Sequence, residues 1–337
     1  MGKRDVTIKD IAGAAGVSIA TVSRYINQNG YVNDSTAQAI RDAIKETGYV
    51  PSFVARSLKT RRSHTFLLIV PDIENPFYSK IARRLQHLSQ ENGYGIMLSD
   101  SEGDTGKELE ALKVARQISA DGIFCATINP KPGVIRMLSE AGTVVVGMNA
   151  FEDGMPFDTV VVHRRGGTNL AVKYLAELGH RDIVFAGGTP GTLIAQSRMN
   201  GYKYAMEKYG LPFRAQNIFE GNFTQSGGYD AGRQIAELRP LPTAVCCAND
   251  LIALGVIKAL NEAGLRVPED VSVTGMDDIP YAELSSPPLT TVENDGALFA
   301  ESAFRRMLQR ISGEGGEPVR LEIPNALRVR RSCRMRG

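Results

Sequence analysis

The sequence predicts an all-α helix-turn-helix headpiece at the N-terminus, followed by an α/β body of two doubly wound parallel-sheet subdomains. Three observations support this. A chain of 337 residues is too long for one ordinary hydrophobic core. Short apolar runs alternate with helical segments from about residue 64 onward. Residues 1–62 carry ten Lys and Arg against five acids, and the remaining residues carry 29 against 32. A basic front end on a mildly acidic body indicates a polyanion-binding module joined to a sensing or catalytic domain.

The composition excludes several classes of protein. With 43% hydrophobic and 23% charged residues, the chain resembles soluble globular proteins. No window approaches 18 uninterrupted apolar residues, so we expect no membrane-spanning helix and no membrane partner. The N-terminal run MGKRDVTIKD lacks the apolar region of an export signal, which predicts a cytoplasmic protein.

The cysteines and histidines give no sign of a metal site. Cys125, Cys246 and Cys247 lie in apolar runs without CxxC spacing, so we predict buried, reduced thiols. The four histidines are scattered and form no HExxH motif or Cys/His cluster. We therefore expect neither a metal ion nor another cofactor.

Three short helices are predicted before residue 50. Thr7 and Asp10 have the spacing of a capping box at the start of the first. Ser18 is a good N-cap for a second helix at about 19–27, and Asn33 begins the cap of a third. Two short helices joined by a tight glycine-containing turn are typical of a helix-turn-helix.

The second helix has the surface that a major groove requires. Its apolar stripe lies on Val22 and Ile26, so Ile19, Ala20 and Arg24 fall on the exposed side. Short side chains at the N-terminal end allow close approach, and an arginine can fork onto a guanine edge. The alternative from these residues alone is a three-helix unit that binds protein.

The next segment favours DNA. Residues 53–59 form a candidate two-turn helix, which is marginal in isolation and needs a partner. Two arginines follow it, which indicates that the partner is nucleic acid. Leu58 beside Ala55 suits a wedge that opens a base step from the minor groove. The alternative is a plain basic linker.

The runs VTIKDIAGAAGVSIATVSRYIN and TGYVPSFVARSLKT resemble the headpiece and hinge of the lactose/galactose-repressor (LacI/GalR) family of transcriptional regulators. One departure is Ser52, where the family most often has Asn. The resemblance implies a homodimer on a palindromic double-stranded operator. It also implies DNA contacts of three kinds: base reading by Ile19, Ala20 and Arg24, phosphate contacts by Thr7, Ser18, Thr21, Ser23 and Asn27, and minor-groove insertion by Ala55 and Leu58.

The body shows two series of alternating strands and helices. This rhythm implies parallel strands joined by helices, with a ligand cleft outside the carboxyl ends of the strands. About five strands are expected in each subdomain. The predicted strands are 66–70, 95–99, 122–125, 144–147, 160–162, 183–186, 244–248, 271–275 and 290–292. The predicted helices between them include 78–92, 107–119, 167–178, 197–209 and 251–263.

Residues at the expected strand ends offer carboxylate, amide, guanidinium and aromatic groups. Asn249 and Asp277 each follow a strand, and Arg198 begins a helix. This mixture suits the hydroxyls and apolar faces of a sugar, and less obviously a nucleobase. The Gly-rich run at 187–192 is neither a dinucleotide fingerprint nor a Walker A loop, so we interpret it as a turn.

The body resembles the periplasmic-binding-protein-like sensor domain of the same family. The resemblance rests on long runs: PDIENPFY at 71–78, ELGHRDIVFAGG at 177–188, PTAVCCANDLIALG at 242–255 and RVPEDVSVTGMDD at 266–278. It implies a small-molecule effector, most simply a sugar. The implied effector residues are Phe77, Tyr78, Asn149, Arg198, Phe223, Asn249, Asp277 and Asn294.

Two positions depart from the family pattern. Asn149 stands where many sugar-responsive members have Asp, and His163 replaces a more usual Asp after Val162. An amide in place of a carboxylate removes an acceptor-only group and adds donors. A different sugar, a phosphosugar or a non-sugar effector such as a nucleobase therefore remain alternatives.

These features predict a regulator and not an enzyme, because no nucleophile–base pair, metal site or nucleotide fingerprint is found. An exported solute-binding protein would share the body but lack the helix-turn-helix. No leucine heptads follow Leu327, which favours a dimer over a tetramer. Effector binding in the cleft is expected to alter the pairing of two hinge segments. The predicted domains are a headpiece at 1–50, a hinge at 51–62 and an effector domain at 63–337, with subdomains at about 63–162 plus 293–322 and 163–292 plus 323–337.

Overall fold

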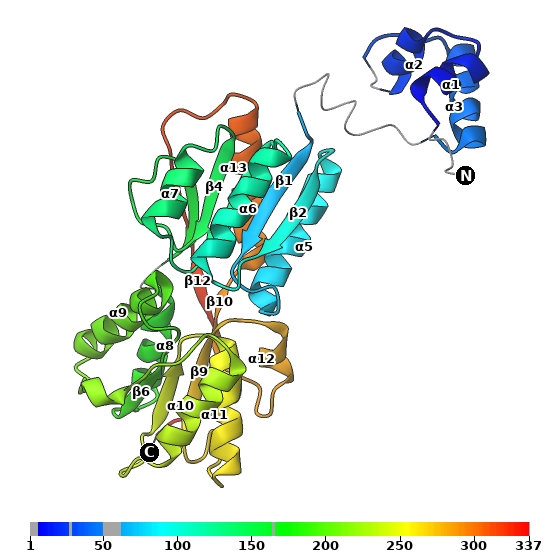
Figure 1. The fold of residues 1–337 in the computed structure, drawn as a ribbon. Helices are drawn as coiled ribbons and strands as arrows, with labels where there is room; N and C mark the ends of the chain where they lie inside the picture. Colours follow the sequence, from blue (N-terminus) through cyan, green and yellow to red (C-terminus); the bar gives the residue numbers. More distant parts are fainter. Residues whose placement is uncertain (1–5, 27–28, 50–61, 164–165, 337) are drawn as a thin grey trace. The chain divides into compact units, whose positions relative to one another are not determined.

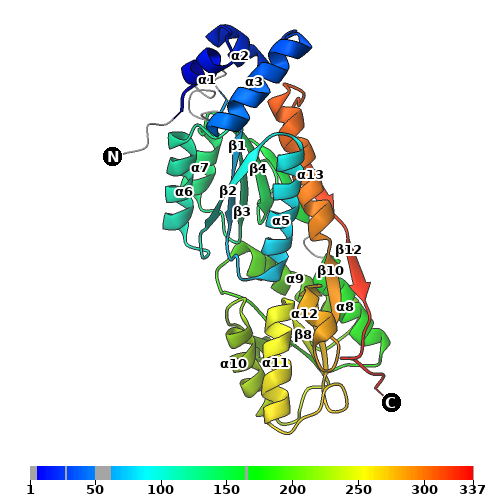
Figure 2. The ribbon, with the colours of Figure 1, turned by 90° about the vertical axis from the view of Figure 1, so that its right-hand side faces the viewer.

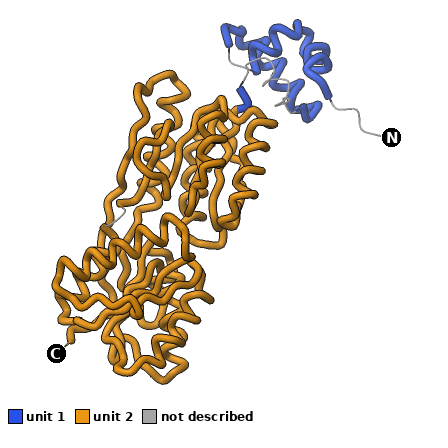
Figure 3. Tube along the Cα trace, turned by 60° about the vertical axis from the view of Figure 1, so that its left-hand side comes forward, with its two compact units in different colours: residues 1–63 blue, residues 64–337 orange. Residues whose placement is uncertain are grey.

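The computed structural model describes residues 6–26, 29–49, 62–163 and 166–336. The chain forms two compact units, residues 1–63 and residues 64–337 (Figure 3). Among the predicted DNA contacts, Asn27, Ala55 and Leu58 lie outside the described residues, as does the predicted hinge helix at 53–59. Their roles stay predictions.

The first unit holds the three predicted short helices, α1 (Ile8–Ala14), α2 (Ile19–Ile26) and α3 (Asp34–Thr47). The Asp10 carboxylate accepts hydrogen bonds from the Thr7 amide at 2.8 Å and from the Thr7 hydroxyl at 2.7 Å, which ties down the start of α1. The Asn33 side chain accepts from the Thr36 amide at 2.8 Å and caps α3. The core of the unit consists of five buried residues: Ile11, Ala12, Val22, Ile40 and Ala43.

The second unit contains two lobes, each built on one sheet (Figure 1). In the first lobe the strand order is β11-β5-β4-β3-β1-β2, and every neighbouring pair is parallel. Helices α5 (Pro76–Glu91) and α13 (Gly296–Ile311) cover one face, while α6 (Thr105–Gln117) and α7 (Pro132–Ser139) cover the other (Figure 2). The strands are β1 Thr65–Val70, β2 Gly95–Asp100, β3 Gly122–Thr127, β4 Val144–Asn149, β5 Asp158–Val162 and β11 Arg320–Ile323.

In the second lobe the strand order is β12-β10-β9-β8-β6-β7. Helices α8 (Gly166–Glu177) and α9 (Leu193–Lys208) pack together on one side, and α10 (Gln225–Ala236) and α11 (Asp250–Glu262) on the other (Figure 1). The short elements are α12 Pro280–Leu284 and the 3₁₀ turn Ala215–Asn217. The strands are β6 Ile183–Ala186, β7 Ile218–Phe219, β8 Ala244–Cys247, β9 Ser272–Asp277, β10 Thr290–Asn294 and β12 Asn325–Arg328.

All nine predicted strands are present within one or two residues at their ends. The two expected parallel sheets are present; each has six strands where about five were expected, and β12 runs antiparallel to β10. The missed strands are short and lack an apolar run, as Arg320–Ile323 illustrates with its alternating charges. Cys125, Cys246 and Cys247 are buried, as predicted. Within the described part of the chain, no helix is long and apolar enough to cross a membrane.

Three connections join the two lobes: β5 leads to α8, β10 leads to α13, and β11 leads to β12. The carboxyl ends of the parallel strands in both sheets face the region between the lobes, where β10 and β12 pass from one lobe to the other (Figure 1). A ligand cleft is therefore expected at this level of the fold.

Glycines allow α10 and α11 to pack in close contact. This packing fixes the position of the two helix starts that border the expected cleft between the lobes. A methyl group at Gly228 would overlap with the backbone of Ile252, and one at Gly255 would overlap with the carbonyl oxygen of Gln225. Thr224 caps the start of α10, and Asn249 caps the start of α11. The small residues thus allow two helix starts to lie side by side beneath the cleft.

We expect Gly228→Ala to lower the free energy of unfolding by about 1–3 kcal/mol, because the added methyl group forces the two helices apart. Urea unfolding followed by circular dichroism measures this change. Gly133→Ala in α7 is the matched control, since nothing lies within 4 Å of its added methyl group. An equal effect of the two substitutions would contradict the close helix contact.

Candidate functional site

Helix α2 presents the predicted base-reading residues on its outer side. Ile19 is 47% exposed, and Ala20 and Arg24 are also exposed. Val22, on the opposite side, is fully buried in the core of the first unit. An exposed arginine near small and apolar side chains on a helix matches what a major groove requires.

Three of the predicted phosphate-contact residues in the described part, Thr7, Ser18 and Thr21, lie at helix starts. The Thr21 amide donates to the Ser18 hydroxyl oxygen at 3.1 Å, and the two hydroxyl groups are 2.8 Å apart. Thr7 lies at the start of α1, and Ser23 is half-buried within α2. The N-terminal end of a helix carries a partial positive charge, so the positions of Thr7, Ser18 and Thr21 suit an anion.

A cavity of about 300 Å³ lies between the two lobes of the second unit. Six of the eight predicted effector residues line it: Phe77, Tyr78, Arg198, Phe223, Asn249 and Asp277. Asn149 and Asn294 lie instead in a separate hollow of about 20 Å³, which shares Arg198 and Ile194 with the main cavity. His163 also lines this small hollow, and its side chain is 55% exposed.

Several residues that line the main cavity were not among the eight predicted effector residues. They follow the carboxyl ends of strands or begin helices: Asp72, Asn75, Ile128, Thr189, Ile194, Asn222 and Thr224. Asn75 and Thr224 are N-caps whose side chains accept from the Phe77 and Gly227 amides. The N-cap preference at the start of each predicted helix is the signal that would have identified these two.

Arg198 holds together the floor of the cavity. Its side chain is buried, and Nη1 donates to the carbonyl oxygen of Ala248 at 2.5 Å. Nη2 donates to Oδ1 of Asp277 at 3.2 Å, which forms a buried ion pair. The guanidinium group also lies over the ring of Phe223, 5.4 Å from its centroid. One side chain on α9 therefore fixes groups that follow β8 and β9.

Asp277 is a buried carboxylate at the end of β9, with its backbone in the left-handed region at φ 108°. Its Oδ1 atom accepts from Arg198 and, at 2.7 Å, from Asn294. Burial raises the pKa of this carboxyl, and the Arg198 charge and the two hydrogen bonds offset only part of that rise. A non-glycine residue held in this conformation indicates strain of the kind that collects at binding sites.

Asn249 orients the aromatic wall of the cavity. Its Oδ1 atom accepts from the Ile252 amide at 2.8 Å, and its Nδ2 atom donates to the Phe223 carbonyl oxygen at 3.1 Å. The ring of Phe223 packs directly against Gly188, where any side chain would overlap with it. Asn249 therefore holds the Phe223 backbone in place at the wall of the cavity.

Tyr78 and Asn149 form a second buried contact, on the side of the first lobe. Asn149 Nδ2 donates to the Tyr78 hydroxyl oxygen at 2.8 Å. Burial raises the pKa of the Tyr78 phenol, with a smaller opposing effect from Arg198, so the phenol stays protonated. Its hydroxyl hydrogen is then available to donate to a ligand in the cavity.

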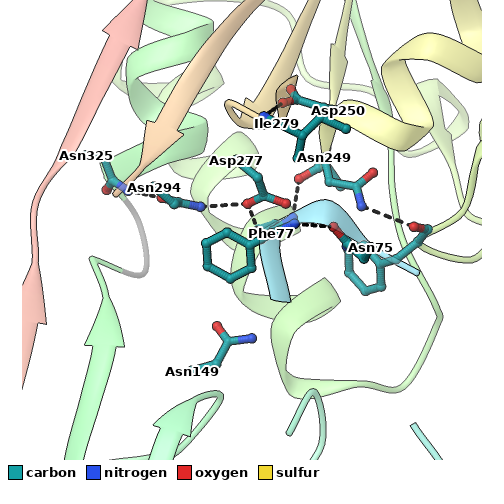
Figure 4. A network of polar contacts seen from close by, with 12 residues as sticks. Asn75, Phe77, Asn149, Asn249, Asp250, Asp277, Ile279, Asn294 and Asn325 are labelled. Carbon is teal, nitrogen blue, oxygen red and sulfur yellow. Dashed lines mark hydrogen bonds and ion pairs between the residues drawn. The ribbon is translucent and has the colours of Figure 1, made fainter. Parts of the chain in front are cut away.

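Polar side chains continue from Asp277 away from the cavity. Asn325 Nδ2 donates to Asn294 Oδ1 at 2.6 Å, and Asn294 in turn donates to Asp277. Figure 4 shows these three side chains in a row, with a dashed contact between successive members. The network thus reaches from the cavity to the strands that connect the lobes.

Comparisons with known proteins agree with this architecture. Residues 7–52 match the family described as bacterial regulatory proteins, lacI family, and residues 172–333 match the periplasmic binding protein-like domain. The HTH-type transcriptional repressor PurR of Pectobacterium carotovorum subsp. carotovorum (strain PC1) is 34% identical over 97% of this chain and 96% of its own length.

Solved structures show the same fold. The lac repressor dimer bound to operator and the anti-inducer ONPF superimposes with a TM-score of 0.88 at 26% identity, covering 98% of this chain and 99% of that chain. The complex of the transcriptional regulator CelR with cellobiose gives a TM-score of 0.74 at 32% identity, covering 97% and 99%. The chain therefore belongs to the lacI family of bacterial regulatory proteins, which are DNA-binding transcriptional regulators and not enzymes.

Proposed function

We propose that this protein is a repressor that binds a palindromic operator as a homodimer in the cytoplasm, under the control of a small molecule in the cavity between its lobes. The observation that carries the proposal is that one chain contains both the exposed helix α2, in its first unit, and a cavity of about 300 Å³ between the lobes of its second unit. The related lac repressor is a dimer bound to operator.

In this proposal residues 1–50 are the DNA-binding headpiece, residues 51–62 the hinge, and residues 63–337 the effector domain. Ile19, Ala20 and Arg24 read bases, because they are the exposed residues of α2, the first two in its first turn and Arg24 in its last. Thr7, Ser18, Thr21 and Ser23 hold the phosphate backbone around them, which fixes the register without reading sequence.

Arg24→Ala should weaken binding to the correct operator by about 1–3 kcal/mol, since a bidentate contact with guanine is lost. The operator is first selected from random DNA with the unaltered protein, and affinities are then measured by fluorescence anisotropy at a fixed salt concentration. Non-specific DNA should be bound almost as before, because the remaining phosphate contacts are unchanged.

Arg41→Ala is the matched control, because it removes an equally exposed guanidinium group from α3. It should leave the preference for the selected operator unchanged. An equal loss for Arg24→Ala on selected and random DNA would exclude Arg24 as a base reader.

For the effector we infer a planar heterocycle of the nucleobase class, in place of the sugar first expected from the sequence. Three carboxylates line the cavity, and each already has partners. Asp72 accepts from the Glu74 and Asn75 amides, Glu102 pairs with Lys107 at 2.5 Å, and Oδ1 of Asp277 accepts from Arg198 and Asn294. No carboxylate is left with both oxygens available for a pair of adjacent sugar hydroxyls.

The lining groups that still have a free donor or acceptor suit the edge of a nucleobase. Asp277 Oδ2 accepts no hydrogen bond from the described residues and is free to accept one from a ligand N–H group. The Tyr78 hydroxyl is free to donate to a ligand carbonyl or ring nitrogen. The aromatic rings of Phe77 and Phe223 supply flat apolar surface. A nucleobase offers a hydrogen-bond donor and an acceptor side by side on the edge of a planar ring. These groups would match the Asp277 oxygen, the Tyr78 hydroxyl and the two aromatic rings.

The test is a thermal-shift panel on the full chain with adenine, guanine, hypoxanthine, uracil and cytosine, against glucose, galactose, ribose and cellobiose. A true ligand at one hundred times its Kd stabilises the folded state by about 2.7 kcal/mol. We expect a base to raise the Tm and the sugars to leave it unchanged. A shift with sugars alone would assign the effector to the sugar class and overturn this inference.

Tyr78→Phe should weaken binding of that base by up to about tenfold, because one hydrogen bond to the ligand is lost. Tyr94→Phe is the matched control, since Tyr94 stacks on Phe66 outside the cavity. Isothermal titration calorimetry measures both affinities. Unchanged affinity in Tyr78→Phe would remove the Tyr78 hydroxyl from the ligand contacts.

A further inference from the structure

Each connection between the lobes carries a polar residue at the same small hollow. His163 directly follows β5, Asn294 is the last residue of β10, and Asn325 is the first residue of β12. All three line the hollow of about 20 Å³ beside the main cavity. Residues that are far apart in the sequence thus meet where the lobes are joined.

Two of these residues connect that joint to the cavity by hydrogen bonds. Asn325 donates to Asn294 at 2.6 Å, Asn294 donates to Asp277 Oδ1 at 2.7 Å, and Arg198 donates to the same oxygen at 3.2 Å. We call this row of Asn325, Asn294 and Asp277 the amide relay. Each amide group in it donates toward the carboxylate, so the row has one direction (Figure 4).

Strand pairing alone does not require the amide relay. Asn294 and Asn325 are already register partners in the antiparallel β10–β12 pair. The Oδ1 atom of Asn325 is buried and has no hydrogen-bond partner among the described residues. A buried acceptor without a partner destabilises a fold by about 1–3 kcal/mol, and an apolar residue would avoid this. The amide therefore has a use beyond packing.

We propose that Asn294 and Asn325 are positioning residues that couple Asp277, at the cavity, to the strands that join the lobes. A change in the charge or hydrogen bonding of Asp277 alters how firmly it holds Asn294, and through Asn294 how firmly β12 is held against β10. The coupling is reciprocal, so a rearrangement of the crossings also changes the orientation of Asp277 toward a ligand.

The test needs neither effector nor DNA, so it fails or succeeds independently of the proposed function. Hydrogen–deuterium exchange of the full chain is followed in a peptide that covers residues 320–330. Four proteins are compared: the unaltered chain, Asp277→Asn, Asn325→Ala and the double variant. Asp277→Asn removes the charge at the cavity end of the relay without changing the size of the side chain.

If the amide relay couples the two ends, Asp277→Asn speeds exchange in this peptide about tenfold, a coupling typical of one hydrogen-bond network. In the Asn325→Ala background the same substitution should add little further. If the two substitutions acted independently, the increase in exchange rate in the double variant would be the product of the increases in the two single variants. That result would overturn the proposal. A peptide covering β1 should exchange equally in all four proteins.

Two further variants guard against a general loss of stability. Asn325→Asp keeps the size of the side chain but has no amide to donate to Asn294, so it should repeat the effect of Asn325→Ala. Asn92→Ala is the matched control, because Asn92 donates only to a carbonyl oxygen within α5. If Asn325→Asp retained the full response to Asp277→Asn, the relay would be excluded.

Discussion

The buried ion pair between Arg198 and Asp277 is the interaction on which the geometry of the cavity depends. Both side chains are almost fully buried, so removal of either would leave an unpaired charge at a cost of about 3–5 kcal/mol. Arg198 also holds Ala248 and Phe223, while Asp277 holds Asn294. The ends of β8, β9 and β10 are therefore placed relative to one another by two residues, and a ligand meets a site that is already assembled.

The hydrogen bonds that the lining side chains already make limit which groups of a ligand the cavity can bind. The lining carboxylates are used for turns, an ion pair and the network around Arg198. Under the proposed function, a ligand rich in hydroxyl groups would leave donors without acceptors, which would weaken its binding relative to a ligand with few donors. The left-handed backbone at Asn149, Asp277 and Asp278 lies at the same level of the fold. Conformations that are costly elsewhere are thus concentrated where side chains turn toward the ligand.

Much of the fold was predictable because most of its strands are buried on both faces and therefore form apolar runs, such as 66–70. The strands β7 and β11 lack such runs, since one has two residues and the other alternates charge. Partners within the site were less predictable. Asn149 was expected in the main cleft, yet its amide turns to Tyr78, which is 71 positions away in the sequence. Such pairings depend on how elements far apart in the sequence pack against one another, and no local sequence pattern carries that information.

The order of the connections has a consequence for biosynthesis. The first lobe is completed only by α13 and β11, which follow the main part of the second lobe in the chain. The N-terminal unit has its own small core and needs neither segment. During translation this unit is therefore able to fold long before the sensor exists, since domains fold as units from the N-terminus onward. Under the proposed function, a chain interrupted before Gly296 would carry α2 without a completed first lobe, and so without effector control of DNA binding.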